Sequence, residues 1–85
     1  MIKPTQVNIF GDKFWLVDGK HHRVDGPAIE WADGSKYWYL NNQRHREDGP
    51  AIDQRNKKEW WLYGEKLEIS SQEEFEQYMK LKAFW

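Results

Sequence analysis

Cysteine is absent from this sequence, which excludes a disulfide framework and any zinc site with cysteine ligands. Histidine offers little in its place, because His21, His22 and His45 do not follow a metal-ligand spacing. The P-loop, the nucleotide-binding glycine fingerprint and the serine-nucleophile motif are missing as well. The sequence therefore predicts no metal site, no cofactor and no catalytic residue.

The sequence has no large excess of positive or negative charge, and it has no long apolar run. The 13 Lys and Arg residues nearly balance the 14 Asp and Glu residues, so neither a basic nucleic-acid-binding surface nor an acidic DNA-mimicking surface is expected. No apolar run approaches the roughly 18 residues of a membrane span, and residues 1–5 lack the charged and apolar regions of a signal peptide. We expect a cytoplasmic protein that neither spans a membrane nor binds nucleic acid.

Large aromatic side chains dominate the hydrophobic content. They make up 16% of the 85 residues, and each ring buries roughly 150–250 Å². A chain of this length forms one domain, residues 1–85, with a core that is only marginally sufficient. A core carried by a few rings favours a thin, flat architecture over a globule.

A 23-residue repeat organises the chain. Residues 11–30 and 34–53 are identical at ten of twenty positions, whereas unrelated segments would share about one. A third, partial copy begins at Trp60, which aligns with Trp38 if one residue is lost from the turn near Asn56. This copy lacks the His-Arg-x-Asp-Gly-Pro segment, as expected where a stacked array ends. The sequence predicts repeat units at about 11–33, 34–56 and 57–67.

Short aromatic and β-branched segments alternate with turn formers inside each unit. The segments predicted as strands are 7–10, 14–17, 27–31, 37–40 and 58–63. Pairs such as Asp18-Gly19 and Asn41-Asn42 supply the positive φ angles of tight hairpin turns. The pattern predicts a mostly β fold, an antiparallel meander of β-hairpin repeats in a single twisted sheet of about six or seven strands.

The end of the chain changes to a helical pattern over about 71–84. Ser71 and Glu74 form a capping box, in which each side chain bonds a backbone amide of the first turn. A helix this short gains its stability from packing, so we expect it to dock on the sheet. The side chains predicted to share its apolar arc are Phe75, Tyr78, Met79, Leu81 and Trp85.

The units resemble MORN-type repeats in a variant form. The resemblance rests on the strand Trp38-Tyr39-Leu40, on the turn Asn41-Asn42 and on the following segment, 45–51, of sequence His-Arg-Glu-Asp-Gly-Pro-Ala; residues 15–28 show the same elements. With its C-terminal helix, the chain is similar to small proteins of tailed bacteriophages, and the same variant units occur in antitoxin-like bacterial proteins. The resemblance implies β-hairpin repeats and a phage-encoded protein that acts in the host cytoplasm.

Strand alternation divides the aromatic residues between two faces of the sheet. Trp15, Trp38 and Trp60 with Val17, Leu40 and Leu62 are predicted on one face. Phe14, Leu16, Tyr37, Tyr39, Trp61 and Tyr63 are predicted on the other. One helix covers only part of one face. Either the sheet curls enough to bury both sets, or one aromatic face is a docking surface, since exposed apolar patches rich in Trp and Tyr mark interaction sites.

The duplicated His-Arg-x-Asp segment is the second candidate site. It comprises His22, Arg23 and Asp25, and again His45, Arg46 and Asp48. A structural role in tying down the loop is favoured over an acid–base or anion-binding role, because a catalytic centre seldom needs two tandem copies.

These observations favour a non-enzymatic protein-binding module, phage-encoded, that modulates or inhibits a host protein; self-association is a related possibility. A small-ligand or lipid-headgroup binder and an antitoxin-like protein remain alternatives, as does a small hydrolase. The residues predicted to contact a partner are Tyr37, Tyr39, Trp61, Tyr63, Arg23, Arg46, His22 and His45.

Overall fold

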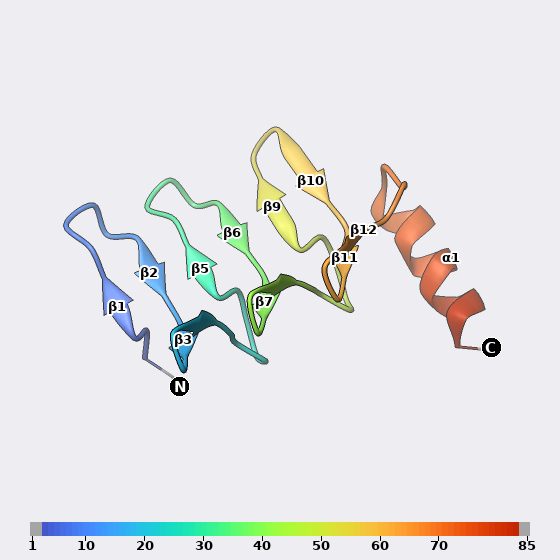
Figure 1. Cartoon of the computed structure of the whole chain (residues 1–85). Helices are drawn as coiled ribbons and strands as arrows, with labels where there is room; N and C mark the ends of the chain where they lie inside the picture. Colours follow the sequence, from blue (N-terminus) through green and yellow to red (C-terminus); the bar gives the residue numbers. More distant parts are fainter. Residues whose placement is uncertain (1–2, 84–85) are drawn as a thin grey trace.

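The computed structural model describes residues 3–83, which form twelve short strands followed by one helix (Figure 1). The strands are β1 (Gln6–Val7), β2 (Lys13–Phe14), β3 (Leu16–Val17), β4 (Lys20–His21), β5 (Ile29–Glu30), β6 (Lys36–Tyr37), β7 (Tyr39–Leu40), β8 (Gln43–Arg44), β9 (Ile52–Gln54), β10 (Lys57–Glu59), β11 (Trp61–Leu62) and β12 (Glu65–Lys66). The helix α1 spans Gln72–Lys82. No helix in this part of the chain is long and apolar enough to cross a membrane.

Six strands form one antiparallel sheet in the order β1-β2-β5-β6-β9-β10. The other six form three two-stranded antiparallel ribbons, β3-β4, β7-β8 and β11-β12. The predicted mostly β architecture is therefore confirmed. The ribbons were not predicted as separate units, because each continues a sheet strand after a single residue, Trp15, Trp38 or Trp60.

The first strand begins one residue earlier than predicted and is shorter. The strand expected at 7–10 lies at Gln6–Val7, and residues 8–11 form the turn. The Asn8 side chain accepts hydrogen bonds from the amides of Phe10 and Asp12, and Gly11 has a φ of 86°. This local bonding of an Asn side chain to its own backbone favours a turn over a strand.

The one-residue loss between the second and third units is visible in strand register. Ile29 pairs with Tyr37 in the first full hairpin, whereas the equivalent Ile52 pairs with Glu59. The second hairpin thus closes over one residue fewer. Trp60 consequently occupies the position of Trp38, as the alignment predicted.

Tight turns close the three ribbons. The central pair has a positive φ in each: 52° and 76° in Asp18-Gly19, 49° and 66° in Asn41-Asn42, and 48° and 83° in Tyr63-Gly64. Two consecutive positive φ angles are those of a type I′ turn, which matches the twist of the flanking strands. Tyr63 tolerates this unfavourable backbone because its ring packs on His45, with 4.0 Å between ring centroids.

A row of alternating Trp and Ala residues forms the core on one face of the sheet. The Trp15 amide donates to the Ala28 carbonyl, and the Trp38 amide to the Ala51 carbonyl, so large and small side chains face each other across neighbouring strands. Ala28 and Ala51 are fully buried, and Trp15 and Trp60 nearly so. This alternation lets the large indole rings pack beside small alanine side chains in a dense core.

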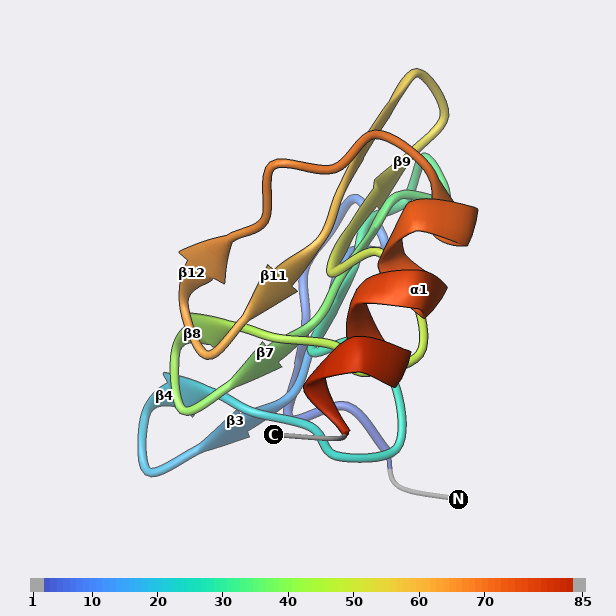
Figure 2. The same cartoon turned by 90° about the vertical axis from the view of Figure 1, so that its right-hand side faces the viewer.

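The helix covers the C-terminal end of that same face (Figure 2). Ser71 caps it by accepting from the Glu74 amide at 3.2 Å, as predicted, while the Glu74 carboxylate bonds Ser70. Phe75 is only 1% exposed, so docking of the helix is confirmed. The docked arc is narrower than predicted, since Met79 is half-buried but Tyr78 and Leu81 are exposed. The predicted helix end at 84 and Trp85 lie outside the described residues.

Candidate partner-binding site

The face of the sheet opposite the helix is called here the front face. Cross-strand pairing places Phe14, Ile29, Tyr37, Ile52 and Glu59 in one row across the sheet. A second row comes from the ribbons, in which Leu16 pairs with His21, Tyr39 with Arg44, and Trp61 with Lys66. The ribbons project away from the sheet on the side opposite α1, so the two rows meet in an open angle (Figure 2).

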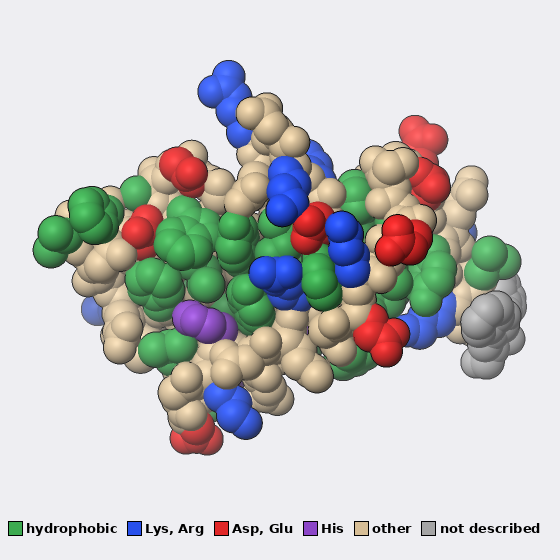
Figure 3. Space-filling view, turned by 45° about the horizontal axis from the view of Figure 1, so that its top comes forward, with side chains coloured by type: hydrophobic (Ala, Val, Ile, Leu, Met, Phe, Trp, Pro, Cys, Tyr) green, Lys and Arg blue, Asp and Glu red, His purple; other side chains and the backbone are tan. Residues whose placement is uncertain are grey.

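Ring contacts join the two rows at the N-terminal half of the front face. The ring centroids of Phe14 and Trp31 are 5.9 Å apart in an edge-to-face arrangement, and those of Trp31 and Tyr37 are 5.5 Å apart. His21 lies 6.2 Å from Phe14 and 5.5 Å from Tyr39. All five side chains are half-buried, so the cluster is packed yet retains solvent contact. Figure 3 shows hydrophobic side chains and a histidine gathered on this side.

The C-terminal half of the front face is polar. The Arg44 guanidinium lies 4.8 Å from the Trp61 ring centre, and its Nε donates to the Tyr39 hydroxyl at 3.3 Å. The Trp61 indole N–H donates to Glu59, whose carboxylate also pairs with Lys57 at 3.2 Å and Lys66 at 3.6 Å. The Trp61 hydrogen bond, followed by the two lysines, holds the pKa of Glu59 below its usual range despite partial burial.

Two polar atoms beneath this face lack hydrogen-bond partners among the described residues. They are Nδ1 of His21 and Nε1 of Trp31, and a third such atom, Nε1 of Trp38, belongs to the other face. Buried polar atoms in native proteins are nearly always bonded, so each exception asks for an explanation. Both side chains pack against aromatic rings, His21 against Phe14 and Tyr39, and Trp31 against Phe14 and Tyr37.

The duplicated loops lie on the opposite face, called here the back face, where the two arginines have equivalent surroundings. The guanidinium of Arg23 stacks 4.0 Å from the Trp15 ring centre, and that of Arg46 lies 4.0 Å from the Trp38 ring centre. Each is mostly buried and points inward. The hydrogen-bond acceptors are Asp25 (3.0 Å) and the Pro27 carbonyl (3.2 Å) for Arg23, and Asp48 (2.8 Å) and the Pro50 carbonyl (3.1 Å) for Arg46. Arg23 differs in one contact, because its guanidinium also lies 3.5 Å from the Glu30 carboxylate.

Glycine in each loop makes room for the guanidinium. A Cβ added at Gly26 would lie 2.7 Å from Cζ of Arg23, and one at Gly49 would lie 2.9 Å from Cζ of Arg46. Both distances are too short for a real contact. The Asp-Gly-Pro sequence is thus tied to the stacked arginine, which explains why the whole segment recurs as a unit.

The two loop histidines connect successive repeats. Nδ1 of His22 accepts from the Asn41 amide, and Nδ1 of His45 accepts from the Tyr63 amide, both at 3.0 Å. The backbone amides of Arg23 and Arg46 donate in the same way to the Tyr39 and Trp61 carbonyls of the next unit. Each loop therefore bonds the ribbon of the following repeat.

The helix replaces the missing third loop. Gln72 accepts from the Trp60 indole N–H at 2.9 Å and donates to the Asp48 carbonyl at 3.2 Å. Gln72 thus contacts the third Trp through its indole N–H, whereas the arginines lie over the rings of the first two. The repeat alignment gave no signal for this residue, because it lies outside the repeated segment.

The structure divides the eight sequence-predicted contact residues into three groups. Tyr37, Tyr39 and Trp61 lie on the front face. Tyr63 lies instead in a turn against His45. The loop residues Arg23, Arg46, His22 and His45 bond within the fold on the back face. Sequence reasoning missed His21, Trp31 and Arg44 as members of the front face; pairing each ribbon strand across its turn would have found His21 and Arg44.

No group of three or more His, Cys, Asp or Glu side chains in the described part of the chain is arranged to hold a metal ion. No protein-family model, curated protein or solved structure matches the chain.

Proposed function

We propose that this chain is a non-enzymatic binding module that holds a partner protein on its front face, with Tyr37, Tyr39 and Trp61 as the central contacts. The observation that carries the proposal is the half-buried aromatic row, which crosses the repeats without being covered by any other described element (Figures 2 and 3). Aromatic residues and Arg are the types that dominate binding energy at protein interfaces.

Rigidity supports this assignment. Close neighbours hold the front-face rings in place: Tyr37 contacts Trp31 and accepts a hydrogen bond from Gln54, and Tyr39 contacts His21 and Arg44. Side chains that are already ordered lose little conformational entropy when a partner binds. A preorganised row of this kind favours a protein surface over a small molecule, because it extends over several repeats rather than enclosing one cavity.

The loops are the weaker candidate site. A lipid headgroup or another anion would need the guanidinium forks of Arg23 and Arg46, and these already bond Asp and backbone carbonyl oxygens within their own loops. Anion binding there would therefore break hydrogen bonds and a cation–π contact. We favour the front face for this reason.

The resemblance to tailed-phage proteins suggests the kind of partner. We propose a protein of the bacterial cytoplasm, which the chain modulates or inhibits by occupying part of its surface. The front face offers aromatic contacts at one half and the charges of Arg44, Glu59, Lys57 and Lys66 at the other. A partner is expected to match this division with an apolar patch beside a polar one.

Site-specific photo-crosslinking in bacterial cells tests the proposal. A photoreactive phenylalanine analogue replaces Tyr39 on the front face or, as the matched control, Tyr78, an aromatic residue on the exposed side of α1. We expect a discrete crosslinked protein from position 39 that is absent from position 78. Equal crosslinking at both positions, or a product only from position 78, would contradict the front-face assignment.

A further inference from the structure

The two edges of the six-stranded sheet differ in chemistry. One row of paired residues on the back face runs Val7, Lys13, Glu30, Lys36, Asp53, Lys58 from the first strand to the last. It is charged throughout, and opposite charges alternate, except at its first position. Charged residues, above all lysine, protect an edge strand against pairing with another chain. The β10 edge ends in such a lysine; the β1 edge, Gln6–Val7, carries no charge.

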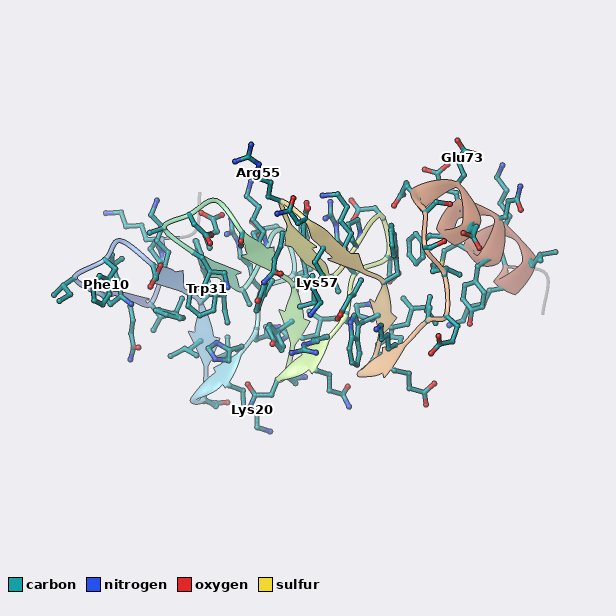
Figure 4. The ribbon with its side chains drawn as sticks, turned by 90° about the horizontal axis from the view of Figure 1, so that it is seen from above. Phe10, Lys20, Trp31, Arg55, Lys57 and Glu73 are labelled. Carbon is teal, nitrogen blue, oxygen red and sulfur yellow. The ribbon has the colours of Figure 1, made fainter. Side chains whose placement is uncertain are left out.

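Exposed apolar side chains gather at the same end of the molecule. Among the described residues, eight large hydrophobic side chains are exposed, and five of them belong to the first hairpin (Val7, Ile9, Phe10) or the first repeat (Val17, Val24); the other three are Tyr63, Tyr78 and Leu81. Ile9 is 94% exposed and Phe10 73%. Figure 4 shows Phe10 at the end of the array farthest from α1. The residues aligned with Ile9 and Phe10 in the next hairpin are Ala32 and Asp33, so the apolar turn is particular to the first one.

Within residues 3–83, the first ribbon receives fewer hydrogen bonds than the later ribbons do. In the second ribbon, the Asn41 amide donates to His22 and the Asn42 amide to the His21 carbonyl. The equivalent amides of Asp18 and Gly19 have no acceptor among the described residues. Only Thr5 reproduces part of the arrangement, because its hydroxyl bonds both the amide and the carbonyl of Leu16. The C-terminal end, by contrast, is covered by α1.

We propose that a second copy of this chain covers this end, with the two β1 strands pairing antiparallel about a two-fold axis. An antiparallel pair of identical strands is self-complementary, so one open edge suffices for both partners. The neutral sequence of β1 brings no like charges together, and the apolar turn residues Ile9 and Phe10 of both copies border the joined edge. The pairing extends the sheet continuously from one copy into the other.

The size of the end face limits how tightly two copies can bind each other. The array runs along the longest of the three extents, 43 × 28 × 22 Å, so its end is about 28 Å by 22 Å (Figure 1). A rectangle of this size, about 600 Å², is the upper limit of what the end can bury per copy, and it is below the roughly 800 Å² per partner of a standard stable interface. We therefore expect a reversible, concentration-dependent dimer with a dissociation constant of about 10–100 µM.

Sedimentation velocity over about 5–500 µM, a range that brackets this dissociation constant, tests the proposal. The wild-type chain is expected to shift from monomer to dimer mass. Val7→Lys, which gives the β1 edge the lysine that the β10 edge already has, should sediment as a monomer throughout. The control is Leu81→Lys, which removes an exposed apolar side chain from α1 and should dimerise like the wild type.

Circular dichroism establishes that each variant is folded. A second test uses the double variant Ile9→Ala/Phe10→Asp, which copies the next hairpin turn and leaves the sequence of β1 unchanged. It should weaken dimerisation at least tenfold. A wild-type chain that stays monomeric, Val7→Lys dimers as stable as wild type, or masses that grow beyond the dimer would each overturn the proposal. Front-face variants leave the dimer intact, so failure here leaves the proposed function untouched.

Discussion

The front and back faces of this sheet both carry aromatic residues, but the two sets of rings are covered by different parts of the chain. On the back face, each indole is covered by something from outside its own strand: Arg23 over Trp15, Arg46 over Trp38, and Gln72 against Trp60. On the front face, the rings contact one another and side chains of the same face, Arg44, Gln54 and Glu59. The residue type therefore does not separate core from surface; what separates them is whether a loop or helix returns to cover the ring.

The comparison also explains how so small a chain forms a stable core. Two loops and one helix are available for cover, and all three lie on the back face. A second covered face would require more chain than the repeats provide. On the front face, Ile29 and Ile52 are buried at 5% and 3% exposure, but the aromatic rings beside them stay half-buried because no loop or helix lies over them.

The largest predicted effect lies where the helix closes the back face. Phe75→Ala removes a ring that is 1% exposed, and the lost burial plus the cavity should reduce the free energy of unfolding by about 3–5 kcal/mol. Denaturant titration measures it, with Leu81→Ala on the exposed side of α1 as the control. A loss below about 1 kcal/mol for Phe75→Ala would show that the helix is a loose appendage.

The two stacked arginines should contribute similarly. Arg23→Ala and Arg46→Ala each remove a cation–π contact and the hydrogen bonds to an aspartate and a proline carbonyl, and each uncovers an indole, so each should reduce stability by about 2 kcal/mol. The additional contact of Arg23 with Glu30 is long, at 3.5 Å, and should add little. Lysine should not restore the loss, because it lacks the planar fork. Arg55→Ala, at the exposed β9–β10 turn visible in Figure 4, is the control and should change stability by less than about 0.5 kcal/mol. Losses that differ widely between Arg23 and Arg46 would contradict the equivalence of the two loops.

The aspartates that these arginines bond should matter less. Asp25 and Asp48 side chains are 55% and 77% exposed, and ion pairs in water contribute little. Asp25→Ala and Asp48→Ala are expected to cost similar amounts, each below about 1 kcal/mol. A cost close to that of removing the arginine would mean that the carboxylate, rather than the stacked ring, holds the loop.

A smaller effect should appear on the front face in acid. The pKa of Glu59 is lower in the folded chain than its ordinary value of 4.5, first because of the Trp61 indole N–H. Its contribution to stability is therefore complete above pH 4.5 and is lost as the pH falls through the lower, folded pKa. Glu59→Gln should flatten this acid dependence in unfolding measurements between neutral pH and acid. An unchanged slope would contradict the assigned hydrogen bond.

Much of the fold follows from the sequence because residues at equivalent positions of the repeat have equivalent surroundings. Trp15, Trp38 and Trp60 were expected on one face, and the pairing of Ala28 and Ala51 beside them follows from the same period. The three ribbons could not be foreseen, since nothing in the sequence marks the bend at each Trp. Gln72 was missed because its partner, Trp60, is close only after the helix docks.

The candidate site was predicted less completely than the fold. Tyr37, Tyr39 and Trp61 were placed on the correct face by strand alternation. His21 escaped because it lies in a ribbon strand, which was not predicted. Trp31 follows the alternation from Ile29, but the two faces were assigned from the other strands only. Tyr63 was misplaced because its positive φ turns its side chain out of the strand pattern.

Side-chain oxidation footprinting of the free chain and of its partner complex tests most directly the claim that one aromatic face stabilises and the other binds. In the free chain, Trp31, Tyr37 and Trp61 should be oxidised, whereas Trp15 and Trp60, at 6% and 4% exposure, should be protected. In the complex, the front-face residues should become protected while Tyr78 on α1 stays reactive. Protection that falls on Tyr78 and spares the front face would contradict the account.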